Sequence, residues 1–223
     1  MTTFVYQGPR RGFDRAVLLA HGAGADLEAP ALRAVADALA DARVPSLRFN
    51  YPYRDAGRRA PDRPAVLDAA TRAAVAELAR RTRLPTEALV VGGRSMGGRY
   101  CSQVVGDRDD PVPVRGLLLL GYPLHPAGRP EVRRDEHFRR LNVPVCFVSG
   151  TRDALAATPD LKRAARRVRG PVTWCWLESA DHGFAPLKSS GRSLDDVLAA
   201  VAAAVVEWVV ALPEEEPRAR DRP

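Results

Sequence analysis

Several residue types that characterise particular classes of protein are scarce in this sequence. It has only three cysteines, Cys101, Cys146 and Cys175, which is an odd number at wide spacings. This pattern fits neither a disulfide framework nor a zinc cluster, so we expect no bound metal and a reducing, cytoplasmic location. The cysteines are then expected to be ordinary core residues.

Long hydrophobic runs are also missing. Residues 1–7 are mixed in polarity and lead directly into Gly-Pro-Arg-Arg, so we expect no secretion signal. The longest apolar stretch, residues 198–212, contains Glu207 and is shorter than the ~18 residues that a membrane span requires. We therefore expect a buried core helix there and no association with a membrane.

Acidic residues are outnumbered by basic ones. The chain has 34 Lys plus Arg against 27 Asp plus Glu, a net charge of +7, which raises the question of nucleic-acid binding. The arginines are spread over nearly every segment, and their small clusters contain no interleaved aromatic residues of the kind that stack on bases. We expect solvated helix faces and no nucleic-acid partner, although a preference for anionic small molecules stays open. A nucleic-acid binder would instead show salt-sensitive retention on heparin or DNA.

Apolar residues make up 46% of the 223 residues, enough for one domain with a sizeable core. Short apolar runs alternate with segments of helical periodicity. Strands are predicted at residues 16–20, 46–51, 88–92, 116–121, 143–149 and 172–177. Helices are predicted at residues 30–42, 65–83, 131–141, 159–168 and 194–212, with another ending near residue 106.

This alternation predicts an α/β fold with a mainly parallel, doubly wound sheet flanked by helices. Residues 1–6 are expected to add an antiparallel edge strand. The domain is expected to span residues 1–212, followed by a disordered charged tail at 213–223. The ligand site of such a sheet lies beyond the carboxyl ends of its strands. Serine, aspartate and histidine all occur directly after predicted strands, so they are expected to meet there.

The sequence Gly93-Arg94-Ser95-Met96-Gly97 lies between an apolar strand and a predicted helix. It matches the nucleophile elbow, a turn so sharp that side chains two residues before and after the nucleophile would collide with neighbouring backbone. The turn exposes the serine hydroxyl at a helix N-terminus, where the helix dipole favours a developing negative charge. We therefore take Ser95 as the candidate nucleophile.

Two nucleotide-binding interpretations of the glycine-rich loops fail. A phosphate-binding loop needs Lys and then Ser or Thr after its last glycine, and the chain has Arg99-Tyr100. The first loop has Leu27 where the dinucleotide fingerprint requires its third small residue. We therefore expect no cofactor.

A serine nucleophile needs a base, and the base needs a group that holds its tautomer. The order serine, acid, histidine accompanies this type of elbow, and His182 is the histidine that satisfies it. Asp153, directly after a predicted strand, is the preferred acid, and Glu178 is the second choice. Asp181 adjoins His182, where its geometry for holding the imidazole is poor.

The motifs at the predicted strand ends are LLAHGAG at 18–24, GGRSMGGR at 92–99, GYPLHP at 121–126, GTRD at 150–153 and DHGF at 181–184. Together they resemble the α/β-hydrolase superfamily over nearly the whole chain. Within it, the chain is most similar to small lidless hydrolases akin to dienelactone hydrolases, in particular the group with testis-expressed and NSL-complex-subunit proteins. The resemblance implies a triad of Ser95, Asp153 and His182. Dienelactone hydrolases typically have cysteine where this chain has Ser95, so their substrate is not carried over.

The oxyanion hole is expected to combine the backbone N–H groups of Met96 and Ala23. The glycine-rich loop around Ala23 has an alternative role, which is to let a helix start close to the sheet. His21 is expected to brace that loop. About twenty residues lie between the strands predicted at residues 116–121 and 143–149. This connection is too short for a cap domain. The candidate substrate-binding residues are Tyr51, Tyr53, Tyr122, His125 and Arg99.

These observations predict a serine hydrolase that cleaves an ester or thioester of a small acyl substrate through an acyl-enzyme, with an anionic substrate as an open option. The chain is expected to act as a monomer or homodimer. The alternative is a catalytically silent binding or scaffold protein that keeps the hydrolase fold. The role of Arg94, and whether Arg99 binds substrate or pairs with an acid, stay open at this point.

Overall fold

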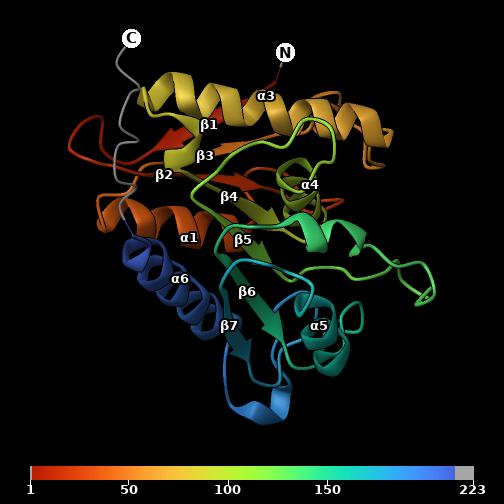
Figure 1. Cartoon of the computed structure of the whole chain (residues 1–223). Helices are drawn as coiled ribbons and strands as arrows, with labels where there is room; N and C mark the ends of the chain where they lie inside the picture. Colours follow the sequence, from red (N-terminus) through yellow and green to blue (C-terminus); the bar gives the residue numbers. More distant parts are fainter. Residues whose placement is uncertain (1, 214–223) are drawn as a thin grey trace.

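The computed structural model describes residues 2–213, which form a seven-stranded sheet flanked by helices (Figure 1). The strand order is β1-β3-β2-β4-β5-β6-β7. The strands are β1 (Phe4–Gln7), β2 (Ala16–Ala20), β3 (Ser46–Phe49), β4 (Leu89–Arg94), β5 (Gly116–Leu120), β6 (Val145–Gly150) and β7 (Val172–Leu177). β1 pairs with β3 in the antiparallel sense, and the other pairs are parallel. The expected antiparallel edge strand is therefore confirmed.

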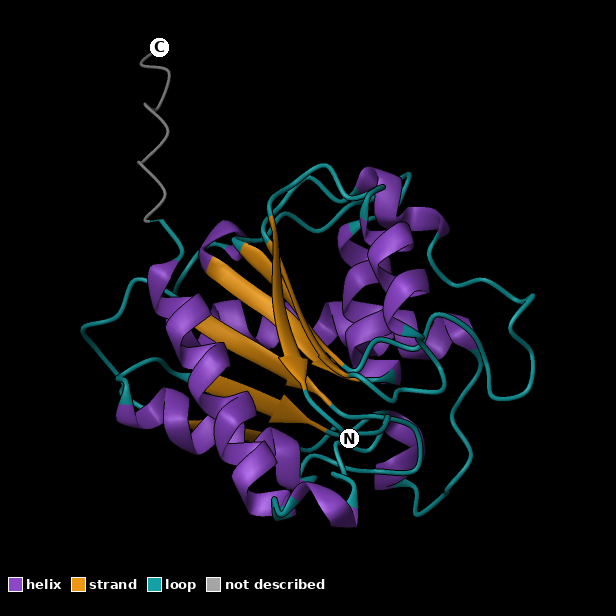
Figure 2. Ribbon diagram, turned by 90° about the horizontal axis from the view of Figure 1, so that it is seen from below, coloured by secondary structure: helices purple, strands orange, loops and turns teal. Residues whose placement is uncertain are grey.

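Helices cover both faces of the sheet, so the central strands are buried on both sides (Figure 2). The helices are α1 (Pro30–Asp41), α2 (Pro52–Asp55), α3 (Pro64–Thr82), α4 (Met96–Val105), α5 (Thr158–Ala165) and α6 (Leu194–Ala211), with short 3-10 helices η1 (Thr86–Ala88), η2 (Glu136–Arg140) and η3 (Lys188–Ser190). α1 and α6 pack on one face, and α3, α4 and α5 pack on the other. Double coverage explains why β2 and β5 are continuous apolar runs rather than alternating ones.

The core helix expected at the end of the domain begins with a well-defined cap. The Ser193 hydroxyl accepts the Asp196 backbone N–H, and the Asp196 carboxylate accepts the Ser193 backbone N–H, which forms a capping box. Within residues 2–213, no helix is both long enough and apolar enough to cross a membrane. The tail predicted at 213–223 lies outside the described residues apart from Pro213.

The helix predicted at residues 131–141 is wrong over most of its length. Only η2 forms there, because the preceding backbone is bonded to a different part of the chain. The Arg134 N–H donates to the Leu124 carbonyl, and the Arg134 carbonyl accepts the Tyr122 hydroxyl. These tertiary hydrogen bonds take the place of the helical pattern. In the described chain, η2 and its flanking loops make up the connection from β5 to β6, and this connection contains no cap domain.

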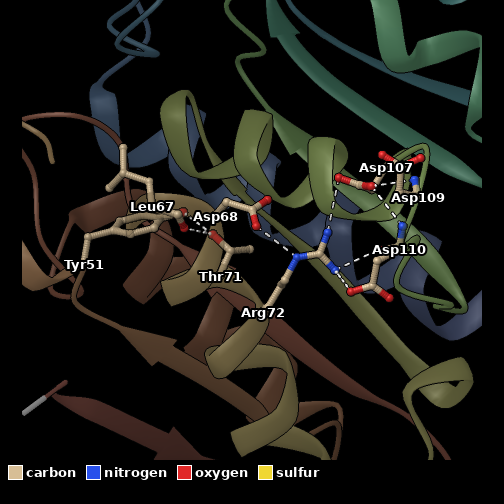
Figure 3. Close-up of polar contacts among 8 residues, drawn as sticks. All are labelled: Tyr51, Leu67, Asp68, Thr71, Arg72, Asp107, Asp109 and Asp110. Atoms are coloured by element: carbon tan, nitrogen blue, oxygen red, sulfur yellow. Dashed lines mark hydrogen bonds and ion pairs between the residues drawn. The ribbon is translucent and has the colours of Figure 1, made fainter. Parts of the chain in front are cut away.

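α3 is held over the sheet by polar contacts at two points (Figure 3). The Tyr51 hydroxyl donates to the Thr71 hydroxyl, which in turn donates to the Leu67 carbonyl. The next residue along the helix, Arg72, pairs with the carboxylates of Asp68, Asp107 and Asp110. The segment after α4 is thereby tied to α3.

Candidate active site

The turn between β4 and α4 presents Ser95 above the carboxyl edge of the sheet. Ser95 has φ 50° and ψ −112°, a backbone conformation that side-chain-bearing residues rarely adopt. A Cβ at Gly93 or Gly97 would lie 2.1 or 2.3 Å from the Ala20 carbonyl oxygen at the end of β2. Both glycines are therefore required by the close approach of β2, as the sequence argument predicted for this motif.

Three side chains from separate strand ends form a continuous hydrogen-bonded chain. The Ser95 hydroxyl lies 2.9 Å from His182 Nε2, and His182 Nδ1 lies 2.8 Å from Asp153 Oδ2. The Nδ1–H donates to the carboxylate, which leaves Nε2 free to accept the serine proton. The structure thus brings together Ser95, His182 and Asp153, although 87 and 29 residues separate them along the chain.

The carboxylate of Asp153 is held in position by the protein itself, without a bound ligand. The Asp153 side chain is fully buried, and its second oxygen accepts the Leu155 backbone N–H at 2.8 Å. Asp181 instead uses its carboxylate to accept the Gly183 and Ala185 N–H groups, which shapes the loop that carries His182. Glu178 contacts the Thr151 hydroxyl. Of the three acids weighed from the sequence, Asp153 is the one in contact with the imidazole.

His21 supports the loop opposite the elbow, as expected. Its Nδ1–H donates to the Gly22 carbonyl, and its Nε2 accepts the Tyr51 backbone N–H. Burial lowers the pKa of His21, which favours the neutral ring that this pair of bonds requires. The loop from β2 therefore keeps a fixed position beside Ser95.

Arg94 lies beneath the site rather than in it. Its guanidinium stacks on the Phe184 ring at 4.4 Å and donates to the Leu120 carbonyl at 3.3 Å. Burial lowers the pKa of Arg94 to about 10, and the carboxylates of Asp153 and Asp181 oppose this shift. Arg94 thus places a positive charge near the buried acid and contacts the loop of His182.

A cavity of about 350 Å³ opens at the serine, a size suited to a small molecule. Ser95, Met96 and Ala23 share its wall, so both expected oxyanion donors lie beside the nucleophile. Met96 is the first residue of α4, where backbone N–H groups have no partner within the helix. The wall also includes Arg99, as expected, and Arg134.

The structure does not place four of the expected substrate-binding residues on the cavity wall. Tyr51 and Tyr53 are fully buried, and the Tyr51 hydroxyl is bonded to Thr71. Tyr122 is also buried, and its hydroxyl donates to the Arg134 carbonyl. The rings of these three tyrosines pack in the core, and they thereby support the strand ends. His125 is half-buried with Nδ1 on the Pro126 carbonyl, and it lies outside the residues that line the cavity.

Sequence reasoning missed Arg134, which lies on the cavity wall. No local signal marks it, because its position depends on the tertiary bonds that prevent a helix at residues 131–135. Pro123, from the same connection as Arg134, and Leu155, from the loop after β6, also line the wall. Within residues 2–213, no group of three or more His, Cys, Asp or Glu residues is arranged to hold a metal ion.

The sheet order, the elbow and the serine–histidine–aspartate chain define the class of α/β-hydrolases. Residues 13–210 match the family model of the α/β-hydrolase domain, so the chain belongs to this family. The resemblance found in the sequence motifs is confirmed.

Solved structures share the fold over nearly the whole chain. An α/β serine hydrolase homologue from Coxiella burnetii has a TM-score of 0.69 and 16% identity, covering 92% of this chain and 91% of its own. A dienelactone hydrolase from Anabaena variabilis has a TM-score of 0.68 and 20% identity over 95% and 92%. A carboxylesterase from Bacillus cereus has a TM-score of 0.62 and 17% identity over 96% and 95%. At these identities, the similarity concerns the fold.

Proposed function

We propose that this protein is a serine hydrolase that cleaves an ester or thioester of a small acyl substrate. The observation that carries the proposal is the hydrogen-bonded chain from the Ser95 hydroxyl through His182 to the buried carboxylate of Asp153, at the wall of an open cavity. Serine hydrolase and carboxylesterase activities named for proteins with the same fold are consistent with it.

The geometry supports a two-step reaction. The Ser95 oxygen attacks the substrate carbonyl carbon while its proton passes to His182 Nε2, and Asp153 stabilises the resulting imidazolium. The backbone N–H groups of Met96 and Ala23 stabilise the oxyanion. His182 then gives the proton to the leaving group, and the carbon–oxygen or carbon–sulfur bond breaks to leave an acyl-enzyme. A water molecule, deprotonated by His182, releases the acid and restores Ser95.

A fluorophosphonate probe tests the nucleophile directly. The probe is expected to label the wild-type protein and not Ser95→Ala. Ser102→Ala is a matched control on the same helix, because Ser102 also contacts a histidine, at 2.8 Å from His137 Nε2, but is fully buried. Labelling of this control should persist. Equal labelling of wild type and Ser95→Ala would contradict the proposal and favour a silent, scaffold-like role.

A further inference from the structure

The cavity at Ser95 contains two arginines that come from different parts of the chain. Arg99 follows Ser95 by four residues and lies in the first turn of α4, where its backbone N–H donates to the Ser95 carbonyl at 3.0 Å. Arg134 comes from the connection between β5 and β6. Both residues line the same cavity as the serine, so a ligand bound at Ser95 lies within reach of two guanidinium groups.

Neither guanidinium forms an ion pair within residues 2–213. Arg99 donates to the amide oxygen of Gln103 at 3.3 Å and stacks on Tyr100, while its buried Nε has no hydrogen-bond partner. In the same described range, the Arg134 side chain makes no hydrogen bond. Most arginines that are partly removed from water are paired, because desolvating an unpaired charge is costly. These two are left available for a ligand.

Three of the nearby carboxylates are occupied by other arginines, whereas Glu136 of the adjoining cavity forms no ion pair within residues 2–213. Asp68 and Asp107 of the adjoining cavity pair with Arg72 (Figure 3). Asp135 pairs with Arg133 and Arg167.

One carboxylate belongs to the wall of the serine cavity itself. Asp62 pairs with Arg58 through Oδ1, its buried Oδ2 has no partner, and it forms no ion pair with either cavity arginine. Burial and the nearby charge of Arg99, which lines the same cavity, lower the pKa of Arg134. The local positive charge is therefore incompletely balanced by the protein.

Both arginines are attached to a backbone that is already held in place. The Arg134 N–H donates to the Leu124 carbonyl, and its carbonyl accepts the Tyr122 hydroxyl. The Arg99 N–H donates to the Ser95 carbonyl in the first turn of α4. Such preorganisation reduces the entropy lost when a ligand binds.

We propose that Arg99 and Arg134 form a carboxylate-binding subsite, and that the ester or thioester hydrolysed at Ser95 carries a carboxylate near its scissile bond. This inference rests on the proposed function. Guanidinium groups bind carboxylates through paired, charge-assisted hydrogen bonds, and two of them in the wall of the cavity orient the substrate so that its carbonyl faces the serine.

Two matched pairs of esters test the proposal and locate the charge. The p-nitrophenyl monoester of adipic acid and p-nitrophenyl hexanoate differ by a carboxylate at the end of the acyl chain. The compounds p-acetoxybenzoate and p-tolyl acetate differ by a carboxylate on the leaving group. In at least one pair, we expect kcat/KM for the anionic ester to exceed that of the neutral ester by about tenfold or more, as expected for a charged hydrogen bond.

Arg99→Gln and Arg134→Gln are each expected to reduce this anionic-to-neutral ratio by about tenfold or more, mainly through a higher KM. Arg166→Gln removes the same charge from an exposed position directly after α5 and should leave the ratio unchanged. The subsite would be overturned if neither pair showed a preference, or if the preference survived both substitutions at Arg99 and Arg134. Turnover of the neutral esters would in that case still support the hydrolase.

A binding measurement separates the subsite from catalysis. By calorimetry, the Ser95→Ala protein should bind monomethyl adipate more tightly than methyl hexanoate, and adding Arg99→Gln should abolish the difference. If the protein shows this selective binding but neither labelling nor turnover, the hydrolase proposal is contradicted and the subsite proposal is retained. Equal binding within this pair, and also within the pair p-acetoxybenzoate and p-tolyl acetate, would contradict the subsite whatever the enzyme does.

Discussion

Ser95 adopts a backbone conformation whose cost is of the order of 1–3 kcal/mol, and the surrounding glycines make that conformation accessible. Gly97→Ala places a methyl carbon 2.3 Å from the Ala20 carbonyl oxygen. We expect it to lower the free energy of unfolding by about 1–3 kcal/mol, because neighbouring backbone must shift. Urea denaturation measures this. Gly22→Ala is the control, since its added carbon meets no atom closer than 3.4 Å, and an equal loss there would contradict the steric argument.

Asp153 is expected to matter through the tautomer of His182. Asp153→Asn keeps the size of the side chain but removes the charge that holds Nδ1–H, so kcat for a neutral ester should fall by about 10³–10⁴-fold with little change in KM. Glu178→Gln is the control, because Glu178 contacts Thr151 instead of the imidazole. Steady-state kinetics would contradict the assignment if Glu178→Gln caused the larger loss.

At the scale of elements, η2 is attached to α4 by a buried polar contact. His137 Nε2 donates to the Ser102 hydroxyl at 2.8 Å, and Ser102 donates to the Arg99 carbonyl at 2.8 Å. Burial, together with the nearby positive charges of Arg140 and Arg99, lowers the pKa of His137 to about 4. The ring is therefore neutral in the folded protein over most of the acid range.

This contact predicts a pH dependence of stability. Between about pH 6.5 and 4, the unfolded chain binds a proton at His137 and the folded chain does not, so stability falls as pH is lowered through this range. The contribution is roughly 3 kcal/mol. His137→Gln keeps an N–H donor without the titration, so its stability should fall less between pH 7 and 4. Chemical denaturation across this range tests the difference, and parallel curves would contradict it.

At the scale of the whole molecule, the last helix is joined to the start of the sheet by Arg15. This buried side chain donates to the carbonyls of Val209, Val210 and Leu212 at the end of α6. Carbonyls at a helix C-terminus lack partners within the helix, so a guanidinium satisfies several of them at once. The contact joins segments that are 194 to 197 residues apart.

Arg15→Met should destabilise the protein by about 2–3 kcal/mol, because it removes charged hydrogen bonds and leaves buried carbonyls without a donor. Thermal or urea unfolding measures the loss. Fluorophosphonate labelling of the folded fraction should be unchanged, since Arg15 precedes the amino end of β2, whereas the cavity is formed by loops at the carboxyl ends of the strands. Arg33→Met on the exposed side of α1 is the control, and a similar loss there would contradict the specific role of Arg15.

The sequence by itself determined the strands, the mainly parallel character of the sheet and the edge at which the site lies, but not the strand order. Continuous apolar runs predicted β2, β4, β5 and β6, because strands covered on both faces need no polar side. The spacing of Gly93, Ser95 and Gly97 predicted the elbow, because the turn imposes a local steric requirement that such a short motif can express. Absence of a nucleic-acid partner and the cytoplasmic location stay predictions.

Only the tertiary structure decided which side chains from distant parts of the chain come into contact. It brought Asp153 rather than Glu178 to His182, because that choice depends on how two loops fold over the sheet. It buried Tyr51 and Tyr122, and it replaced an expected helix with backbone bonds that put Arg134 beside Arg99. These outcomes depend on contacts between segments far apart in the chain, whereas periodicity and short motifs report mainly on local geometry.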